Sequence, residues 1–223
     1  MTARARCFYS GWLLGCILLF AAAGAMAGYK ARPWVIHARD SYPASLTSEG
    51  VTIAVDPLFR DDLAARIFDK NDIVTRGIMP LAIVVFNDND FPIIVDGASI
   101  ELIQGEDHYH TQPVNEVVHR LFQKSGRGSF IPNPLPRRVP AVDQGNEDAL
   151  IDFDHKFLSN KTVGSHDKGG GFLYVQIPGV GDMGAYLSKA RVYIPQIVRQ
   201  DNGTELMFFE IELKPAIDAA PAK

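Results

Sequence analysis

The sequence predicts a mainly β protein, built as a single antiparallel β-sandwich with two or three short inserted helices after an N-terminal signal segment. At least five segments show the apolar runs or the apolar–polar alternation of strands. Turn-forming residues separate several of these segments, and only three stretches show the apolar period of a helix. Short strands separated by turns are typical of one sheet packed on another.

The stretch from Gly77 to Gly105 predicts a hairpin at the centre of this sandwich. Pro80 to Phe86 is almost entirely apolar, as in a strand buried on both faces, and Ile93 to Ile103 drifts into alternation. Asn87-Asp88-Asn89-Asp90 lies between them, and such short polar side chains close turns. A calcium loop also uses these residue types, but it needs ligands at alternating positions, a bend glycine and a later Glu. We therefore interpret the four residues as a turn.

The first 27 residues predict export. Arg4 and Arg6 precede an apolar region from Trp12 to Ala23, and Ala25-Met26-Ala27 has the small residues that signal peptidase accepts. We expect residues 1–27 to be a signal peptide that is cleaved after Ala27. Export would place the protein in the periplasm or outside the cell.

Two alternatives for this segment stay open. Residues 8–28 are long enough to remain as a membrane anchor in the cytoplasmic membrane. Leu13-Leu14-Gly15-Cys16 resembles a lipobox, although the apolar region continues beyond the cysteine instead of ending there. The remaining chain is exported in each case.

Composition narrows the class of partner. Both cysteines, Cys7 and Cys16, lie in the signal segment, so the cleaved chain has no disulfide, which favours a bacterial envelope protein over a secreted animal domain. The formal net charge is −4, with 22 basic and 26 acidic residues. Because nucleic-acid binding needs a surplus of Lys and Arg, we expect no nucleic-acid partner.

The rest of the chain divides into a lead-in, a sandwich and a tail. Residues 28–50 lack periodicity and predict an extended lead-in, residues 51–215 the sandwich, and residues 216–223 a disordered tail. The expected helices cover Leu58–Phe68, Thr111–Lys124 and Asn146–Leu158. The other expected strands cover Val51–Val55 (which Asp56-Pro57 ends), Phe172–Ile177, Arg191–Val198 and Glu205–Leu213, the last two joined by a turn at Asp201-Asn202-Gly203.

An inserted loop over residues 125–145 is the predicted binding segment, together with the outer face of the preceding helix. The loop is rich in Gly and Pro, and its apolar residues have no periodic face on which to be buried. The expected binding residues are Arg127, Phe130, Ile131, Leu135, Arg137 and Arg138. The alternative is that the apolar members pack back on the sandwich while the arginines pair with surface carboxylates.

The strand order resembles that of exported bacterial immunoglobulin-like β-sandwich domains, many of which have no assigned function. The resemblance covers roughly Val51 to Leu213. It depends on the apolar strand ending in Asn87-Asp88, on Gly171-Phe172-Leu173-Tyr174-Val175, and on the closing Glu205-Leu206-Met207-Phe208-Phe209-Glu210. It implies an immunoglobulin-like sandwich, from which this chain departs by its inserted helices and long loop.

Histidines supply the alternative function, a metal-binding protein or a metal-dependent hydrolase. His108 and His110 would share one face of a strand, and Asn115-Glu116-Val117-Val118-His119 resembles a zinc-binding helix in which Asn replaces the first ligand. A site would then use His108, His110 and His119 with Glu116 as the base. The competing interpretation is that these are exposed polar residues at a strand-to-helix junction.

Two further motifs lack the context that their chemistry needs. Gly179 to Gly184 matches a dinucleotide fingerprint, but a strand at Arg191 leaves no room for the crossover helix. Ser165-His166-Asp167-Lys168 matches Ser-x-x-Lys but lies in a glycine-rich loop. We therefore expect no cofactor and a non-catalytic interaction or structural module of the cell envelope, whose partner is an envelope protein or another macromolecule.

Overall fold

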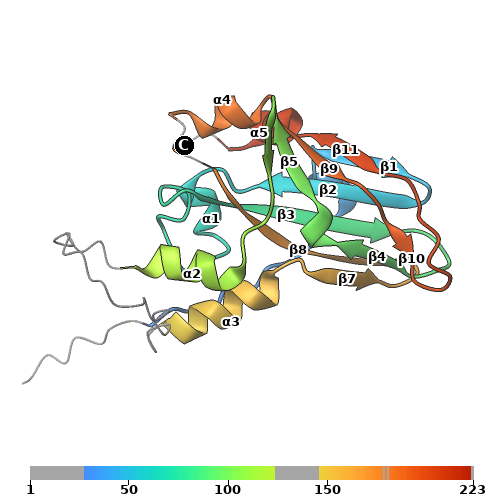
Figure 1. The fold of residues 1–223 in the computed structure, drawn as a ribbon, viewed down its shortest axis with the longest axis horizontal. Coiled ribbons are helices and arrows are strands. Elements are labelled where there is room, and N and C mark those ends of the chain that lie inside the picture. The colour runs from blue at the N-terminus through green and yellow to red at the C-terminus, as the bar shows by residue number, and fades with distance from the viewer. Residues whose placement is uncertain (1–27, 124–145, 178, 180, 222–223) are drawn as a thin grey trace, which may run out of the picture.

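The computed structural model describes residues 28–123, 146–177, 179 and 181–221, and these form three antiparallel sheets with a few short helices (Figure 1). The predicted mainly β, antiparallel fold is therefore confirmed, and the arrangement is consistent with a sandwich. The first sheet has the order β1-β2-β3-β8. Its strands are β1 (Ser45–Ser48), β2 (Val51–Pro57), β3 (Ile78–Asn87) and β8 (Asp167–Gln176).

Two smaller sheets complete the fold. The second sheet has the order β10-β4-β7, and the third has the order β11-β9-β5-β6. Their strands are β4 (Ile93–Asp96), β5 (Glu101–Gln104), β6 (Asp107–Tyr109), β7 (Asn160–Val163), β9 (Arg191–Ile194), β10 (Val198–Arg199) and β11 (Phe209–Glu212). All three sheets contribute to one apolar core, for example through Ile83, Val95 and Val192.

Strand β3 is buried along its whole length, as its apolar run predicts. Leu81, Ile83 and Val85 face the main core. The alternate residues Val84 and Phe86 lie on the outer face of the sheet, where residues of the lead-in cover them. A strand covered on both sides carries apolar residues at every position.

The lead-in, residues 28–50, has more regular structure than the extended path that the sequence predicts. Residues 28–50 contain a 3-10 helix, η1 (Arg39–Ser41), and the edge strand β1. Tyr42 and Trp34 pack on the outer face of the first sheet, and the Trp34 ring lies 4.7 Å from that of Phe172. The sheet needs this segment, because Phe86 and Val84 would otherwise face water.

The predicted central hairpin is also wrong. Strand β3 pairs with β2 and β8, whereas β4 pairs with β7 and β10, so the Asn87–Asp90 turn passes the chain between two sheets. The Asn87 side chain is buried, and its amide donates to the carbonyls of Phe91 and Gly164 at 2.8 Å. These bonds satisfy the carbonyls of the crossing segments and explain why an amide occupies this position.

The expected single strand from Ile93 to Ile103 is broken at Gly97. A short 3-10 helix, η2 (Gly97–Ser99), separates β4 from β5 and sends them into different sheets. A Cβ atom at Gly97 would lie 1.9 Å from the carbonyl oxygen of Leu158, so no other residue fits without movement of the backbone. Alternation continues across the break and therefore does not reveal it.

Two helices match their predictions closely. Helix α2 (Val114–Phe122) buries Val114, Val117, Val118 and Leu121, and α3 (Glu147–Lys156) packs against it (Figure 1). The first expected helix is shorter, since α1 covers only Asp61–Ala64 before a series of turns. Two helices were not predicted: α4 (Met183–Leu187), and α5 (Lys214–Ala219), which covers the first half of the expected tail.

The buried face of α3 contains an ion pair that the apolar pattern did not predict. Asp152 and Lys156 are 6% and 8% exposed, and the Lys156 Nζ lies 2.6 Å from both carboxylate oxygens of Asp152. The Tyr29 hydroxyl donates to the same carboxylate at 2.5 Å, which fixes the start of the lead-in against α3. Burial and this carboxylate raise the pKa of Tyr29, so its hydroxyl keeps its proton.

No helix among the described residues is long and apolar enough to cross a membrane. The expected signal segment, residues 1–27, lies outside the described part of the chain.

Candidate functional site

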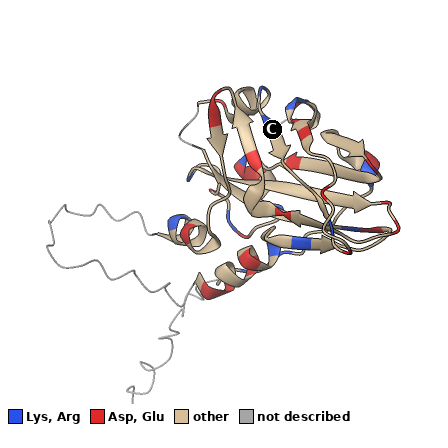
Figure 2. Ribbon diagram, turned by 45° about the vertical axis from the view of Figure 1, so that its right-hand side comes forward, with Lys and Arg blue, Asp and Glu red and all other residues tan. Residues whose placement is uncertain are grey.

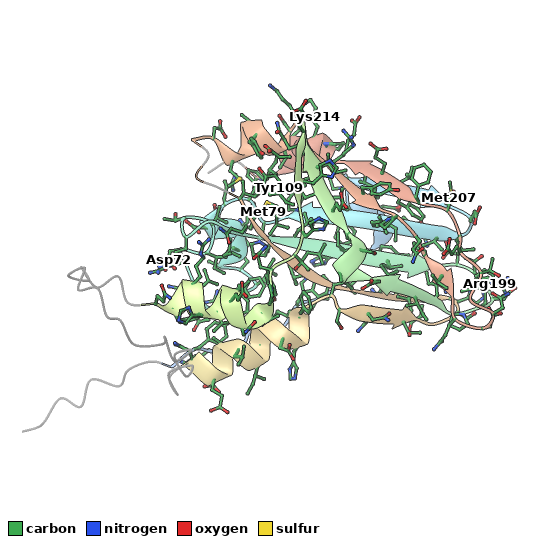
Figure 3. The ribbon with its side chains drawn as sticks, in the orientation of Figure 1. Asp72, Met79, Tyr109, Arg199, Met207 and Lys214 are labelled. Atoms are coloured by element: carbon green, nitrogen blue, oxygen red, sulfur yellow. The ribbon has the colours of Figure 1, made fainter. Side chains whose placement is uncertain are left out.

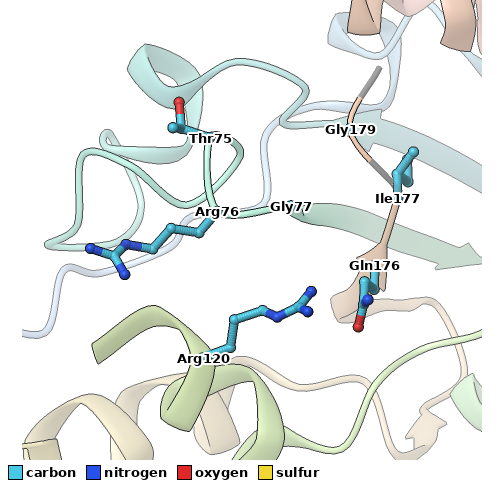
Figure 4. Close-up of a pocket in the computed structure, with 7 residues that line it drawn as sticks. All are labelled: Thr75, Arg76, Gly77, Arg120, Gln176, Ile177 and Gly179. Carbon is cyan, nitrogen blue, oxygen red and sulfur yellow. The ribbon is translucent and has the colours of Figure 1, made fainter. Parts of the chain in front are cut away.

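A cleft of about 440 Å³ opens between α2, the start of β3 and the end of β8. We call it the arginine cleft, because Arg76 and Arg120 both line it; in Figure 4 their side chains extend in opposite directions, that of Arg120 toward Gln176. Its other lining residues are Thr75, Gly77, Gln176, Ile177 and Gly179. Gly77 adopts a left-handed backbone angle, φ = 81°, that turns the chain into β3 at the floor of the cleft.

Arg76 is held by intramolecular contacts. Its Nε donates to Asp72 at 2.7 Å, and its Nη1 donates to the carbonyl oxygen of Gln123 at 3.3 Å. Although partial burial opposes it, hydrogen bonds from Lys70 and Arg76 lower the pKa of Asp72, so this carboxylate stays ionised. Arg76 therefore acts as a fixed wall that ties the start of β3 to the end of α2.

Arg120 differs, because it forms no ion pair or hydrogen bond with any residue that the structure describes. Its side chain is exposed and extends from α2 toward Gln176 and Ile177 (Figure 4). Its Nη1 lies 3.8 Å from the position that a Cβ at Gly77 would occupy. A guanidinium keeps its charge at all relevant pH values and presents paired donors, which suit a carboxylate or a phosphate.

The cleft lies at one end of the molecule. Figure 3 places Asp72 at the end that carries α2, far from Arg199 and Met207. Glu147 and Asp148 on the neighbouring helix α3 are exposed, and Figure 2 shows acidic positions, in red, along the helices at this end of the molecule. The positive charge is therefore local to the cleft and is not part of a broad basic face.

Of the predicted binding site, the structure describes helix α2 but not the loop over residues 125–145. Arg120 is on the predicted outer face of that helix, and α2 ends two residues before the loop. The six loop residues lie outside the described part: Arg127, Phe130, Ile131, Leu135, Arg137 and Arg138. Arg76 was not singled out from sequence because it lies in an irregular segment far from α2 along the chain.

The candidate metal-binding histidines fall into two separate environments. His108 Nδ1 lies 2.6 Å from a Glu101 carboxylate oxygen, and His110 Nε2 lies 4.0 Å from the other. His119 is on α2, where the Gln123 amide lies 2.8 Å from its Nδ1. Within the described residues, no three His, Cys, Asp or Glu side chains are grouped to hold a metal ion.

The residues of the Ser-x-x-Lys match and of the dinucleotide-fingerprint match make local structural contacts. Ser165 donates through Oγ to the carbonyl of Asn89 at 2.9 Å, and His166 Nε2 lies 2.8 Å from Asp90, so both tie two loops together. Asp182 accepts from the Ala185 amide and caps the first turn of α4, and the following strand β9 is antiparallel to its neighbours. Neither motif has the geometry of its catalytic namesake.

No protein-family model, no curated protein and no solved structure matches this chain. Its fold places it in the class of mainly β proteins with antiparallel sheets.

Proposed function

We propose that this protein is an exported, non-catalytic interaction module of the bacterial cell envelope that holds an acidic segment of a partner protein in the arginine cleft. The observation that carries the proposal is the side chain of Arg120, which extends into the cleft, whereas the Asp72 carboxylate pairs with Lys70 and Arg76. Export and the envelope location are supported by the signal-like residues 1–27 and by a remaining chain without cysteine.

The shape of the cleft favours a side chain or short segment over a large ligand. One wall is Arg76, already partly neutralised by Asp72, and the other is Arg120, whose charge is available. A partner carboxylate would add a charge-assisted hydrogen bond at the rim of an interface, which sets specificity and association rate more than affinity. The proposal needs no cofactor.

The test uses a fluorescently labelled hexaglutamate peptide and the full-length protein. We expect weak, salt-sensitive binding by fluorescence anisotropy, with the affinity reduced about tenfold or more by Arg120→Glu because a like charge then faces the peptide. Arg66→Glu is the matched control, since it changes the net charge by the same amount and Arg66 is also exposed, with the Asp62 carboxylate 4.0 Å away. Equal peptide affinity for Arg120→Glu and the wild type would refute the placement of the site.

A further inference from the structure

A second concave site lies on the outer face of the first sheet, between the lead-in and the sheet. Two cavities of about 440 and 260 Å³ share five lining residues, so they adjoin each other. The shared residues are His37, Tyr42, Asp56, Leu58 and Ile67. We call the combined space the Asp56 cavity. Its size is within the range of small-ligand sites.

The smaller part of the cavity has aromatic walls. Asp56 pairs with Ala82 across β2 and β3, and Ala82 pairs with Phe172 across β3 and β8, so the three residues form one row on the outer face. Ala82 is small and leaves a depression between its two neighbours. Trp34 of the lead-in lies over Phe172, with ring centroids 4.7 Å apart, and closes one side.

The larger part is lined mainly by apolar groups. Leu58, Phe59 and Leu63 follow β2, and Ala216 and Ala219 of α5 form the opposite wall. Arg60 donates through Nη1 to the carbonyl of Pro221 at 2.8 Å, which ties the end of the α5 segment to the residues after β2. Helix α5, expected to be a disordered tail, is therefore a wall of this site.

Asp56 is the one acidic side chain among the described residues that line either part. Its carboxylate has no hydrogen-bond or ion-pair partner among the described residues, and the nearby Tyr42 hydroxyl accepts from the His37 amide at 3.0 Å. The carboxylate contacts water at the mouth, but the protein around it removes enough solvent to raise its pKa, and His37 opposes this shift. The other charged group is Arg66, which lines the larger part and lies 4.0 Å from Asp62.

We propose that the Asp56 cavity binds an organic ammonium group on an apolar stem, such as the side chain of a lysine. The carboxylate would pair with the ammonium group, and Trp34 and Phe172 would add the attraction of aromatic rings for a cation. Leu58, Ile67 and Phe59 fit the methylene stem, which gains from leaving water. Asp56 is exposed at the mouth of the cavity and has no partner among the described residues, so a ligand of opposite charge can pair with it without displacing an existing contact.

The site has a built-in reporter. The chain has two tryptophans, Trp12 in the expected signal segment and Trp34 in the wall of the cavity. In the full chain with Trp12→Phe, all tryptophan fluorescence comes from Trp34. The probe is n-hexylammonium, and its neutral counterpart is 1-hexanol, which has the same stem without the charge.

We expect a saturable change of Trp34 fluorescence with n-hexylammonium and a response at least about tenfold weaker with 1-hexanol. Asp56→Asn keeps the shape of the side chain and should weaken n-hexylammonium binding by about tenfold or more. Asp40→Asn, an exposed acid on η1 outside the cavity, is the matched control and should leave binding unchanged. Equal responses to both probes, or unchanged binding by a folded Asp56→Asn protein, would overturn the proposal.

This experiment is independent of the hexaglutamate test. The two sites have opposite charge and share no lining residue. A negative result in the hexaglutamate test therefore does not bear on the Asp56 cavity, and a negative result with n-hexylammonium does not bear on the arginine cleft.

Discussion

Lys156 donates to both carboxylate oxygens of Asp152, one turn earlier on α3, with nitrogen–oxygen distances of 2.6 Å, and both residues are buried. The Lys156 Nζ also donates to the carbonyl of Ile67 at 3.2 Å, which joins α3 to the turns after α1. Burial lowers the pKa of Lys156, and the Asp152 carboxylate opposes that shift. Burial of the Lys156 ammonium group is therefore stabilised by the Asp152 carboxylate, and burial of that carboxylate by Lys156.

Asp152→Ala should lower the free energy of unfolding by about 3–5 kcal/mol, because it leaves a buried ammonium group and the Tyr29 hydroxyl without their acceptor. Urea denaturation at pH 7 measures the change. Asp218→Ala is the matched control: its partner Lys214 is also one helical turn away, but the pair is exposed, so a loss below about 0.5 kcal/mol is expected. If both variants lose equally little, the pair does not stabilise the core.

Gly97→Ala should destabilise the protein by about 1–3 kcal/mol or more, because the added methyl group would overlap the Leu158 carbonyl and displace the chain between β4 and β5. Thermal and urea unfolding measure the effect. Gly181→Ala provides the control, since a Cβ there meets no atom within 4 Å. A fully stable Gly97→Ala protein would mean that this crossing is looser than described.

Asp56→Asn should gain stability relative to the wild type as pH rises from 3 toward 7. Desolvation raises the Asp56 pKa above its unfolded value of about 3.9, so the folded protein binds the proton more tightly and loses stability as pH rises through that window. Asn has no such cost. Urea midpoints at pH 3, 5 and 7 measure the gap.

Asp62→Asn is the control of opposite sign for this pH series. Hydrogen bonds from Arg60 lower the Asp62 pKa, so the wild type should gain over this variant as pH rises. The gain is expected to be small, because the pair is exposed. The same trend in both variants would contradict the assigned role of Asp56.

Replacing residues 125–145 with a short Gly/Ser linker should leave the domain folded and weaken its binding of the partner. The apolar face of α2 is already covered in the described structure, with Val117, Val118 and Leu121 buried, so the helix does not need the loop for burial. Circular dichroism melting and hexaglutamate anisotropy give the two readouts. A large drop in the melting temperature would assign the loop to the core, and unchanged binding would place the partner site elsewhere.

Purification without an affinity tag should yield protein without stoichiometric zinc. His108 and His110 both lie near Glu101, whereas His119 contacts Gln123 on α2, so the three predicted ligands do not form one group. Elemental analysis measures the metal content. One zinc per chain that is lost in both His108→Ala and His119→Ala would replace the non-catalytic proposal with the metal-dependent alternative.

The local sequence predicted a helix or strand correctly where the burial of that element leaves a regular apolar pattern along the chain. The apolar spacing of Val114, Val117, Val118 and Leu121 located α2 because a helix against a core repeats every 3.6 residues. The apolar run of β3 likewise predicted a strand covered on both sides. The mainly β, antiparallel class follows from such patterns, since each depends on neighbours along the chain.

Tertiary structure alone decided which strands pair and where the cavities lie. An Asn/Asp turn between two apolar runs has the same local chemistry whether the strands pair or enter separate sheets, so only the partners of β3 and β4 distinguish the cases. From the sequence, Asp56 is likewise only the residue that ends a strand, and Arg76 is only an arginine in a loop. Their roles come from Trp34, Phe172 and Arg120, residues distant in sequence that the fold brings beside them, and periodicity within one element carries no information about such contacts.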